Sequence, residues 1–280
     1  MQFSLFLSIL VFVAVRGAGN SLSEDYLSFG DNALSNDLSN EAISYYQEGI
    51  EKWTEEDSLV TILSLHTNLG TALSSTGKDD EAANQYREAI STYSNKIEDI
   101  VDKATKKQAS DITAQASFFL GMVLQDAGKV REAIDAYSSA AILDPYHWAS
   151  LANLGSILHD QLRLHDEALE AYNKAYEILT QPEIEPTDAP AEPRFILSEL
   201  QYRIGLCLSH NFDRKCAMRD QPETPVSCRE MATHAFSLAV QYNPENDSAK
   251  HMLATVTADA TMKRASNKYV EKLFDDYAEK

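Results

Sequence analysis

Glycine, proline and cysteine are all scarce in this 280-residue chain, which contains 10, 8 and 3 of them. A chain built only from β-strands needs many tight turns, and such turns draw on glycine and proline. Alanine, leucine, glutamate and lysine, which favour helices, fill the periodic stretches instead. The composition therefore predicts an all-α protein.

Basic residues are also in short supply, because 24 lysines and arginines stand against 43 aspartates and glutamates, for a net charge of −19. Such a chain repels the phosphates of nucleic acids and of anionic membranes, so neither is an expected partner. A basic peptide or a basic protein face would fit the charge better. Acidity that only keeps a large exposed surface soluble is the simpler alternative.

Sequence motifs of catalytic and phosphate-binding sites are missing as well. No G-x-G-x-x-G, phosphate loop, H-E-x-x-H or G-x-S-x-G occurs, and no C-x-x-C pair suggests a zinc site. The histidines are scattered, and His210 and His234 lack the spacing of metal ligands. We expect His66, His159, His165 and His234 at the surface or between helices. The chain is therefore predicted to hold no catalytic site, no metal and no cofactor of its own.

The longest apolar run lies at the amino terminus. Residues 3–15 are all apolar or small, and Gly17, Ala18 and Gly19 follow as small residues suited to a signal peptidase. About 13 apolar residues are too few to span a bilayer, which takes about 20. We therefore predict a signal peptide over residues 1–19 and a place in the secretory pathway, in the ER lumen or outside the cell, with no membrane attachment after cleavage. A permanent anchor is the alternative.

The three cysteines fall close together, and an oxidising lumen would make them informative. Cys216 and Cys228 flank a charged stretch that reads as irregular, so a disulfide between them would fix that loop. Cys207 lies on a helix face and is expected to be buried. The triplet that starts at Asn246 is a candidate N-glycosylation site.

A repeated frame of small residues is the strongest pattern in the chain. In five units, an apolar residue and a glycine are followed by an alanine, by an aromatic residue four positions later and by a small residue three positions after that. The units are Phe29-Gly30, Ala42, Tyr46 and Gly49; Leu69-Gly70, Ala82, Tyr86 and Ala89; Leu120-Gly121, Ala133, Tyr137 and Ala140; Leu154-Gly155, Ala168, Tyr172 and Ala175; and Ile204-Gly205, Ala232, Phe236 and Ala239.

This frame resembles the tetratricopeptide repeat family, whose 34-residue unit carries Leu-Gly, Ala-x3-Phe/Tyr and a closing proline. The resemblance implies a right-handed superhelix of antiparallel helix pairs, an α-solenoid. A small residue suits the close approach of two helices, and we expect the aromatic residue to fill the wedge between successive pairs. Gly77 and Gly128 are expected to end the first helices of their pairs.

Uneven spacing divides the chain further. Repeats one to four occupy residues 23–180, a proline-rich acidic connector occupies 181–193, and the fifth repeat with a following helix occupies 194–262. Gly205 and Ala232 lie 27 positions apart instead of 12, which indicates an insertion containing two cysteines. Repeats two and three are also spread apart, so we expect a lengthened helix or an extra turn there.

In the tetratricopeptide family the first helix of each pair lines a concave groove, so the resemblance implies a ligand-binding face. Asn68 and Asn153 recur at one position and are similar to the asparagine ladder of O-linked sugar transferases, which implies capture of a peptide backbone. Ser28, Phe119 and Arg203 interrupt that ladder, and ordinary helix-surface polarity is the alternative. The groove residues, whose mixture favours a protein or peptide ligand, are Leu27, Asp31, Asn68, Thr71, Phe118, Met122, Asn153, Ser156 and Tyr202.

The carboxyl-terminal stretch, residues 265–280, forms a predicted amphipathic helix. It either closes the solenoid or resembles the junction in predicted methyltransferases that carry tetratricopeptide repeats. The second resemblance implies an S-adenosylmethionine-binding domain beyond Lys280, for which this chain would present substrates. A scaffold that binds a peptide or protein is the leading prediction, the methyltransferase part is the alternative, and a substrate-binding arm related to O-linked glycosyltransferases is a weaker one. The oligomeric state stays open.

Overall fold

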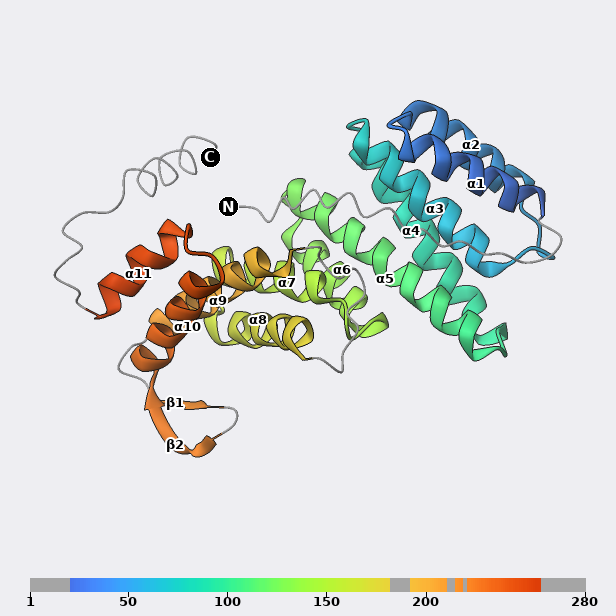
Figure 1. Cartoon of the computed structure of the whole chain (residues 1–280). Coiled ribbons are helices and arrows are strands. Elements are labelled where there is room, and N and C mark those ends of the chain that lie inside the picture. Colours follow the sequence, from blue (N-terminus) through green and yellow to red (C-terminus); the bar gives the residue numbers. More distant parts are fainter. Residues whose placement is uncertain (1–20, 182–191, 211–214, 219–220, 258–280) are drawn as a thin grey trace. The chain divides into compact units, whose positions relative to one another are not determined.

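The computed structural model describes residues 21–181, 192–210, 215–218 and 221–257 (Figure 1). They belong to two compact units that divide between residues 150 and 151, and each unit is described by itself. The predicted signal peptide at 1–19, most of the predicted connector at 181–193 and the predicted helix at 265–280 lie outside the described residues. No helix among the described residues is both long enough and apolar enough to cross a membrane.

The amino-terminal unit consists of three antiparallel helix pairs. We call the first helix of a pair its A helix and the second its B helix. The A helix α3 packs against both α1 and α5. The B helices α2 and α4 each pack against the next A helix as well as their own. The pairs are α1 (Leu22–Ser35) with α2 (Ser39–Lys52), α3 (Leu59–Ser75) with α4 (Asp79–Lys96), and α5 (Lys103–Asp126) with α6 (Val130–Leu143).

The carboxyl-terminal unit continues the alternation of A and B helices. The helix α7, Trp148–Asp160, belongs to it from residue 151, and α8, His165–Thr180, packs against α9, Pro193–Ser209. The helix α9 packs against α10, Cys228–Tyr242, and α10 packs against α11, Asp247–Thr257. The predicted all-α tetratricopeptide fold is thus confirmed in the packing of successive helix pairs.

In every helix pair an aromatic ring of the B helix lies on the glycine of its A helix. A methyl group added at Gly70 would lie 2.5 Å from Tyr86, and one added at Gly205 would lie 2.5 Å from Phe236. The other pairs are Gly30 with Tyr46, Gly121 with Tyr137, and Gly155 with Tyr172. Each ring therefore packs between the two helices of its own pair. Tyr86 also contacts Phe119 of the next pair, at 5.7 Å between ring centroids, in the wedge expected from the sequence.

Tight turns with one left-handed residue join the A and B helices. Gly77 (φ 77°) and Gly128 (φ 71°) take this conformation after α3 and α5, as predicted. Asp37 (φ 59°) and Arg163 (φ 58°) take it after α1 and α7, where a side chain makes the conformation costly. The fourth turn, residues 161–164, is one residue longer than the second and third turns.

Both predicted irregularities in spacing have a structural form. The helix α5 is 24 residues long, and a 3-10 turn, η1 (Ile97–Asp99), precedes it, so the wide second interval holds a lengthened helix and an extra turn. The insertion in the fifth repeat was read as irregular, and that reading is wrong for its backbone. It contains two antiparallel strands, β1 (Lys215–Met218) and β2 (Gln221–Ser227), and β2 leads directly into α10.

Candidate functional site

The predicted groove residues of the amino-terminal unit lie on the packed A helices α1, α3 and α5. Leu27, Asp31, Asn68, Thr71 and Met122 are all partly exposed. Each lies within three positions of the glycine of its helix. We call these five residues the A-helix row.

A shared carboxylate links the first two A helices. Oδ1 of Asp31 accepts hydrogen bonds from Nδ2 of Asn68 and from the hydroxyl group of Tyr46, each over 2.8 Å. Burial raises the pKa of Asp31, and the two hydrogen bonds oppose that rise. Asn68 is therefore oriented by α1, so its side chain is fixed before any ligand arrives.

The other buried tyrosines of this unit reach the A helices in the same way. The Tyr86 hydroxyl lies 3.4 Å from Oγ1 of Thr71, and Tyr137 donates to Oε1 of Gln125 over 2.9 Å. Burial is the main reason why the pKa of Tyr86 is raised. The rings thus fill the interior while their hydroxyl groups hold polar side chains on the A helices.

Phe118 lies deeper than its predicted place in the groove. It is buried, and its ring lies 5.9 Å from Tyr137 and 4.9 Å from His147. The adjacent Phe119 is partly exposed and contacts both Phe118 and Tyr86. Two accessible apolar side chains of α5 are therefore Met122, within the A-helix row, and Phe119, near it.

The predicted groove residues of the carboxyl-terminal unit are less exposed. Asn153 and Ser156 are buried, at 7% and 5% exposure, whereas Tyr202 is partly exposed and packs against Phe236. Ser156 also donates a hydrogen bond to Asp160 within the same helix. Asn68 and Asn153 thus differ in exposure, although they occupy the same position of the repeat.

A buried arginine takes the ladder position of the fifth repeat. Arg203 donates from Nη1 to Oδ2 of Asp160 over 2.9 Å and from Nε to Oε1 of Glu199 over 3.0 Å. Burial would raise the pKa of Asp160, but a hydrogen bond from His159 and the charge of Arg203 outweigh burial and hold it well below its usual range. The sequence singled out Arg203 only as a break in the ladder. Its spacing of four residues from Glu199 is a local signal for that ion pair, whereas Asp160 lies 43 positions away.

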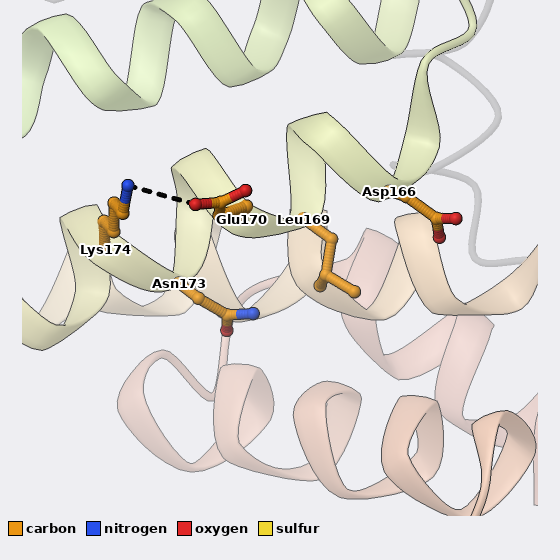
Figure 2. Close-up of a pocket in the computed structure, with 5 residues that line it drawn as sticks. All are labelled: Asp166, Leu169, Glu170, Asn173 and Lys174. Atoms are coloured by element: carbon orange, nitrogen blue, oxygen red, sulfur yellow. Dashed lines mark ion pairs between the residues drawn. The ribbon is translucent and has the colours of Figure 1, made fainter. Parts of the chain in front are cut away.

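Figure 2 shows a surface hollow along one face of α8. Lys174 forms an ion pair with Glu170 over 3.1 Å. All the residues that line the hollow come from α8. A site that recognises a small molecule usually draws polar groups from several elements around a concave pocket. One helix face does not provide that convergence. The lining residues are Asp166, Leu169, Glu170, Asn173 and Lys174.

The cysteines and the candidate glycosylation site can also be placed. Cys228 is disulfide-bonded, while Cys207 is free and buried. The side chain of Cys216 lies outside the described residues, so its pairing with Cys228 stays a prediction. Asn246 donates to Oγ of Ser198 and accepts from the amide of Ala249, each over 3.0 Å, so a glycan there would displace the first bond.

Comparison with known protein families identifies the repeats. Residues 64–95 and residues 113–181 each match a model described as a tetratricopeptide repeat. The chain therefore carries tetratricopeptide repeats, as its Gly and aromatic frame indicated. No curated protein matches the sequence.

Solved structures resemble the chain at low sequence identity. PilF from Pseudomonas aeruginosa matches at a TM-score of 0.57 and 16% identity, covering 92% of this chain and 97% of that one. MamA from Desulfovibrio magneticus RS-1, residues 41 to the end, matches at a TM-score of 0.51 and 15% identity, covering 82% and 99%. YrrB, described as a TPR protein with an unusual peptide-binding site, matches at a TM-score of 0.51 and 15% identity, covering 81% of this chain and 89% of that one. These similarities establish the fold.

Proposed function

We propose that this chain is a protein-interaction scaffold whose A-helix row binds an extended segment of a peptide or protein. The observation that carries the proposal is the shared carboxylate of Asp31, which fixes Asn68 on the face of two adjacent A helices. Pre-oriented polar groups lower the cost of ordering on binding. The fold is shared with YrrB, whose description includes a peptide-binding site, and that likeness supports a peptide ligand here.

The chemistry of the A-helix row suits a peptide backbone. Asn68 uses Nδ2 to bind Asp31, which leaves its amide oxygen as an acceptor for a peptide N–H group. Both hydrogen bonds to Asp31 use Oδ1, so Oδ2 can accept from a ligand. Phe119 and Met122 provide apolar contact on the next A helix. With a net charge of −19, the chain favours a segment that carries lysine or arginine.

The proposal is tested by selecting linear peptides on the full chain and measuring their affinity by fluorescence polarisation. Asn68→Ala removes one polar contact and is expected to weaken the selected peptides by about three- to tenfold. Met122→Arg places a charge on the apolar part of the row and is expected to weaken them by more than about tenfold.

Ile142→Arg is the matched control, because Ile142 is 79% exposed on a B helix. It adds the same charge away from the A-helix row and should leave the affinity unchanged. Circular dichroism should show that all three variants are folded. Peptides that bind all three variants as tightly as the parent chain would overturn the proposal, as would peptides that lose affinity equally in Ile142→Arg.

We further propose that the chain acts in the secretory pathway. The disulfide at Cys228 supports an oxidising compartment, since cytosolic thiols are kept reduced. The test is the intact mass of the protein from its native source. A mass that lacks the first 17 to 19 residues supports the predicted leader, and a mass that retains them contradicts it.

The two enzyme-linked alternatives gain no support from the described residues. The methyltransferase resemblance rests on residues 265–280, which lie outside them. The glycosyltransferase resemblance rests on Asn68 and Asn153, of which Asn153 is buried. The scaffold remains the function that the described geometry favours.

A further inference from the structure

Three histidines converge in the carboxyl-terminal unit. His159 lies in the last turn of α7, His165 is the first residue of α8, and His210 directly follows α9. One ring nitrogen from each lies within 4.8 Å of those of the other two. The sequence predicted surface or inter-helix positions for His159 and His165, and no metal-ligand spacing was found for His210. The fold instead gathers them at one place.

The repeat architecture explains why these residues meet. His159 and His210 lie four and five residues after the glycines of successive A helices, so both lie at the carboxyl ends of helices that run in the same direction. His165 opens the B helix directly after the turn that follows His159. The ring centroids of His165 and His210 are 3.5 Å apart, and that of His159 is 5.0 Å from that of His165.

A charged partner fixes the ring of His159. Its Nδ1 lies 2.7 Å from Oδ1 of Asp160, and Asp160 is held in turn by Arg203 through Oδ2. An ionised carboxylate can only accept, so Nδ1 of His159 carries the hydrogen and Nε2 keeps its lone pair. A carboxylate behind a histidine is the arrangement that orients metal-ligating imidazoles in proteins.

Two ring nitrogens of the three histidines lack hydrogen-bond partners in the described part of the chain. Nε2 of His159 and Nδ1 of His165 are both buried and unpartnered among the described residues. A buried nitrogen without a partner loses the hydrogen bonds that water gave it, and a metal ion would replace them. His210 is exposed, so an ion could reach the cluster from solvent.

Burial and nearby charges both act on the rings of this cluster. Burial, and then the charge of the neighbouring histidines, lowers the pKa of both His165 and His210. Arg163 adds positive charge nearby and opposes a cation, whereas Asp160 and Asp166 add negative charge.

We propose that His159, His165 and His210 bind a divalent first-row transition metal ion, with Zn²⁺ as the best fit. Imidazole ligands suit zinc, while calcium and magnesium require oxygen ligands. Tetrahedral zinc with bonds of about 2.0 Å places its ligand nitrogens about 3.3 Å apart. Small rotations of the rings bring the three nitrogens from within 4.8 Å to that spacing and separate the stacked pair. His210 is exposed, so water could supply the fourth ligand.

Such an ion would join the turn between α7 and α8 to the end of α9. The chain leaves α9 at His210 towards the two-stranded insertion, which returns through β2 into α10. The metal would therefore fix the point where the insertion departs from the repeat.

The proposal is tested on the untagged full chain after treatment with a chelator. Titration with zinc chloride in a calorimeter should show one ion per chain, and Co²⁺ should give the visible absorption of a tetrahedral nitrogen site. His165→Ala and His210→Ala should each weaken zinc binding by at least about 100-fold. His210 is exposed, so its removal should leave the fold intact, which circular dichroism can verify.

His234→Ala is the matched control, because His234 is exposed on α10 and outside the cluster. It should bind zinc as the parent chain does. Asp160→Asn should weaken binding by about 10- to 100-fold through the loss of orientation. Absence of saturable binding, or zinc binding that survives in the His165→Ala/His210→Ala double variant, would overturn the proposal.

Discussion

Tyr46 donates its hydroxyl hydrogen to Asp31 over 2.8 Å, although its own side chain is fully buried. Because Asn68 donates to the same oxygen, a single carboxylate group connects α1, α2 and α3. The interior of the first repeat and the proposed binding face of the second are thus parts of one hydrogen-bond network. Changes to Asp31 should therefore affect both stability and ligand affinity.

The ionisation of Asp31 should lower stability as pH rises. Burial raises its pKa in the folded chain, so the unfolded chain releases this proton first as pH increases from about 4. The parent chain therefore loses stability as pH rises through the folded pKa, and Asp31→Asn, which cannot titrate, does not. Urea unfolding at pH 4 and pH 7 should show that the free energy of unfolding of the variant, relative to that of the parent, is higher at pH 7 than at pH 4.

Asp57 provides a control of opposite sign. A hydrogen bond from the backbone amide of Thr54 lowers the pKa of Asp57, so its contribution is present at neutral pH and lost in acid. The free energy of unfolding of Asp57→Asn should therefore decrease relative to that of the parent chain as pH rises. If both variants follow the same pH dependence, the interpretation of Asp31 is wrong.

His147 should make the amino-terminal unit sensitive to mild acid. Burial lowers its pKa to about 4, and the side chain is 2% exposed. In the unfolded chain this histidine takes up a proton near pH 6.5, whereas in the folded chain it stays neutral down to about pH 4. The free energy of unfolding should therefore fall by about 2 kcal/mol between pH 7 and pH 5. His147→Asn should show a smaller loss over this range. An equal loss in His234→Ala and His147→Asn would assign the effect to other groups.

The left-handed turn at Asp37 offers a stabilising substitution. Glycine adopts a φ of 59° without strain, so Asp37→Gly should raise the free energy of unfolding by about 0.5–1 kcal/mol. Asn36→Gly is the control, because Asn36 has an ordinary φ of −102° and gains nothing. Thermal or urea unfolding measures both. A destabilised Asp37→Gly variant would show that the aspartate side chain matters more than its backbone strain.

The thiols should react in a defined order. Burial raises the pKa of Cys207 to about 12, so the folded protein should react slowly with a maleimide. After denaturation without a reductant, one thiol should be labelled, and reduction should expose all three. Mass spectrometry counts the labels. Three labels before reduction would exclude the disulfide at Cys228.

The helix pairs could be predicted from the sequence because their close packing requires a glycine and an aromatic residue at regular positions. Gly70 and Tyr86 must be small and aromatic for one pair to close, and the same demand recurs in every repeat. The two strands of the insertion escaped prediction, since the segment Gln221–Ser227 contains two prolines and no alternation of apolar and polar residues.

The contacts between repeats that carry the two proposed sites were harder to predict from the sequence. The sequence predicted Asp31 and Asn68 on the proposed binding face, but their bond joins residues 37 positions apart. His159 and His210 likewise meet only because successive A helices end side by side. No local spacing encodes such meetings, which depend on how one repeat stacks on the next.

The glycine and ring at the centre of each pair make the repeats interchangeable parts. Because an aromatic ring, tyrosine in four pairs and phenylalanine in the fifth, closes every pair on the same glycine position, the distance between the two helices does not depend on the residues that face solvent. A helix pair could therefore be exchanged as a cassette, carrying its own recognition residues into a neighbouring position. Residues on the surface of each repeat can therefore vary while the glycine and aromatic residues of the interior stay the same.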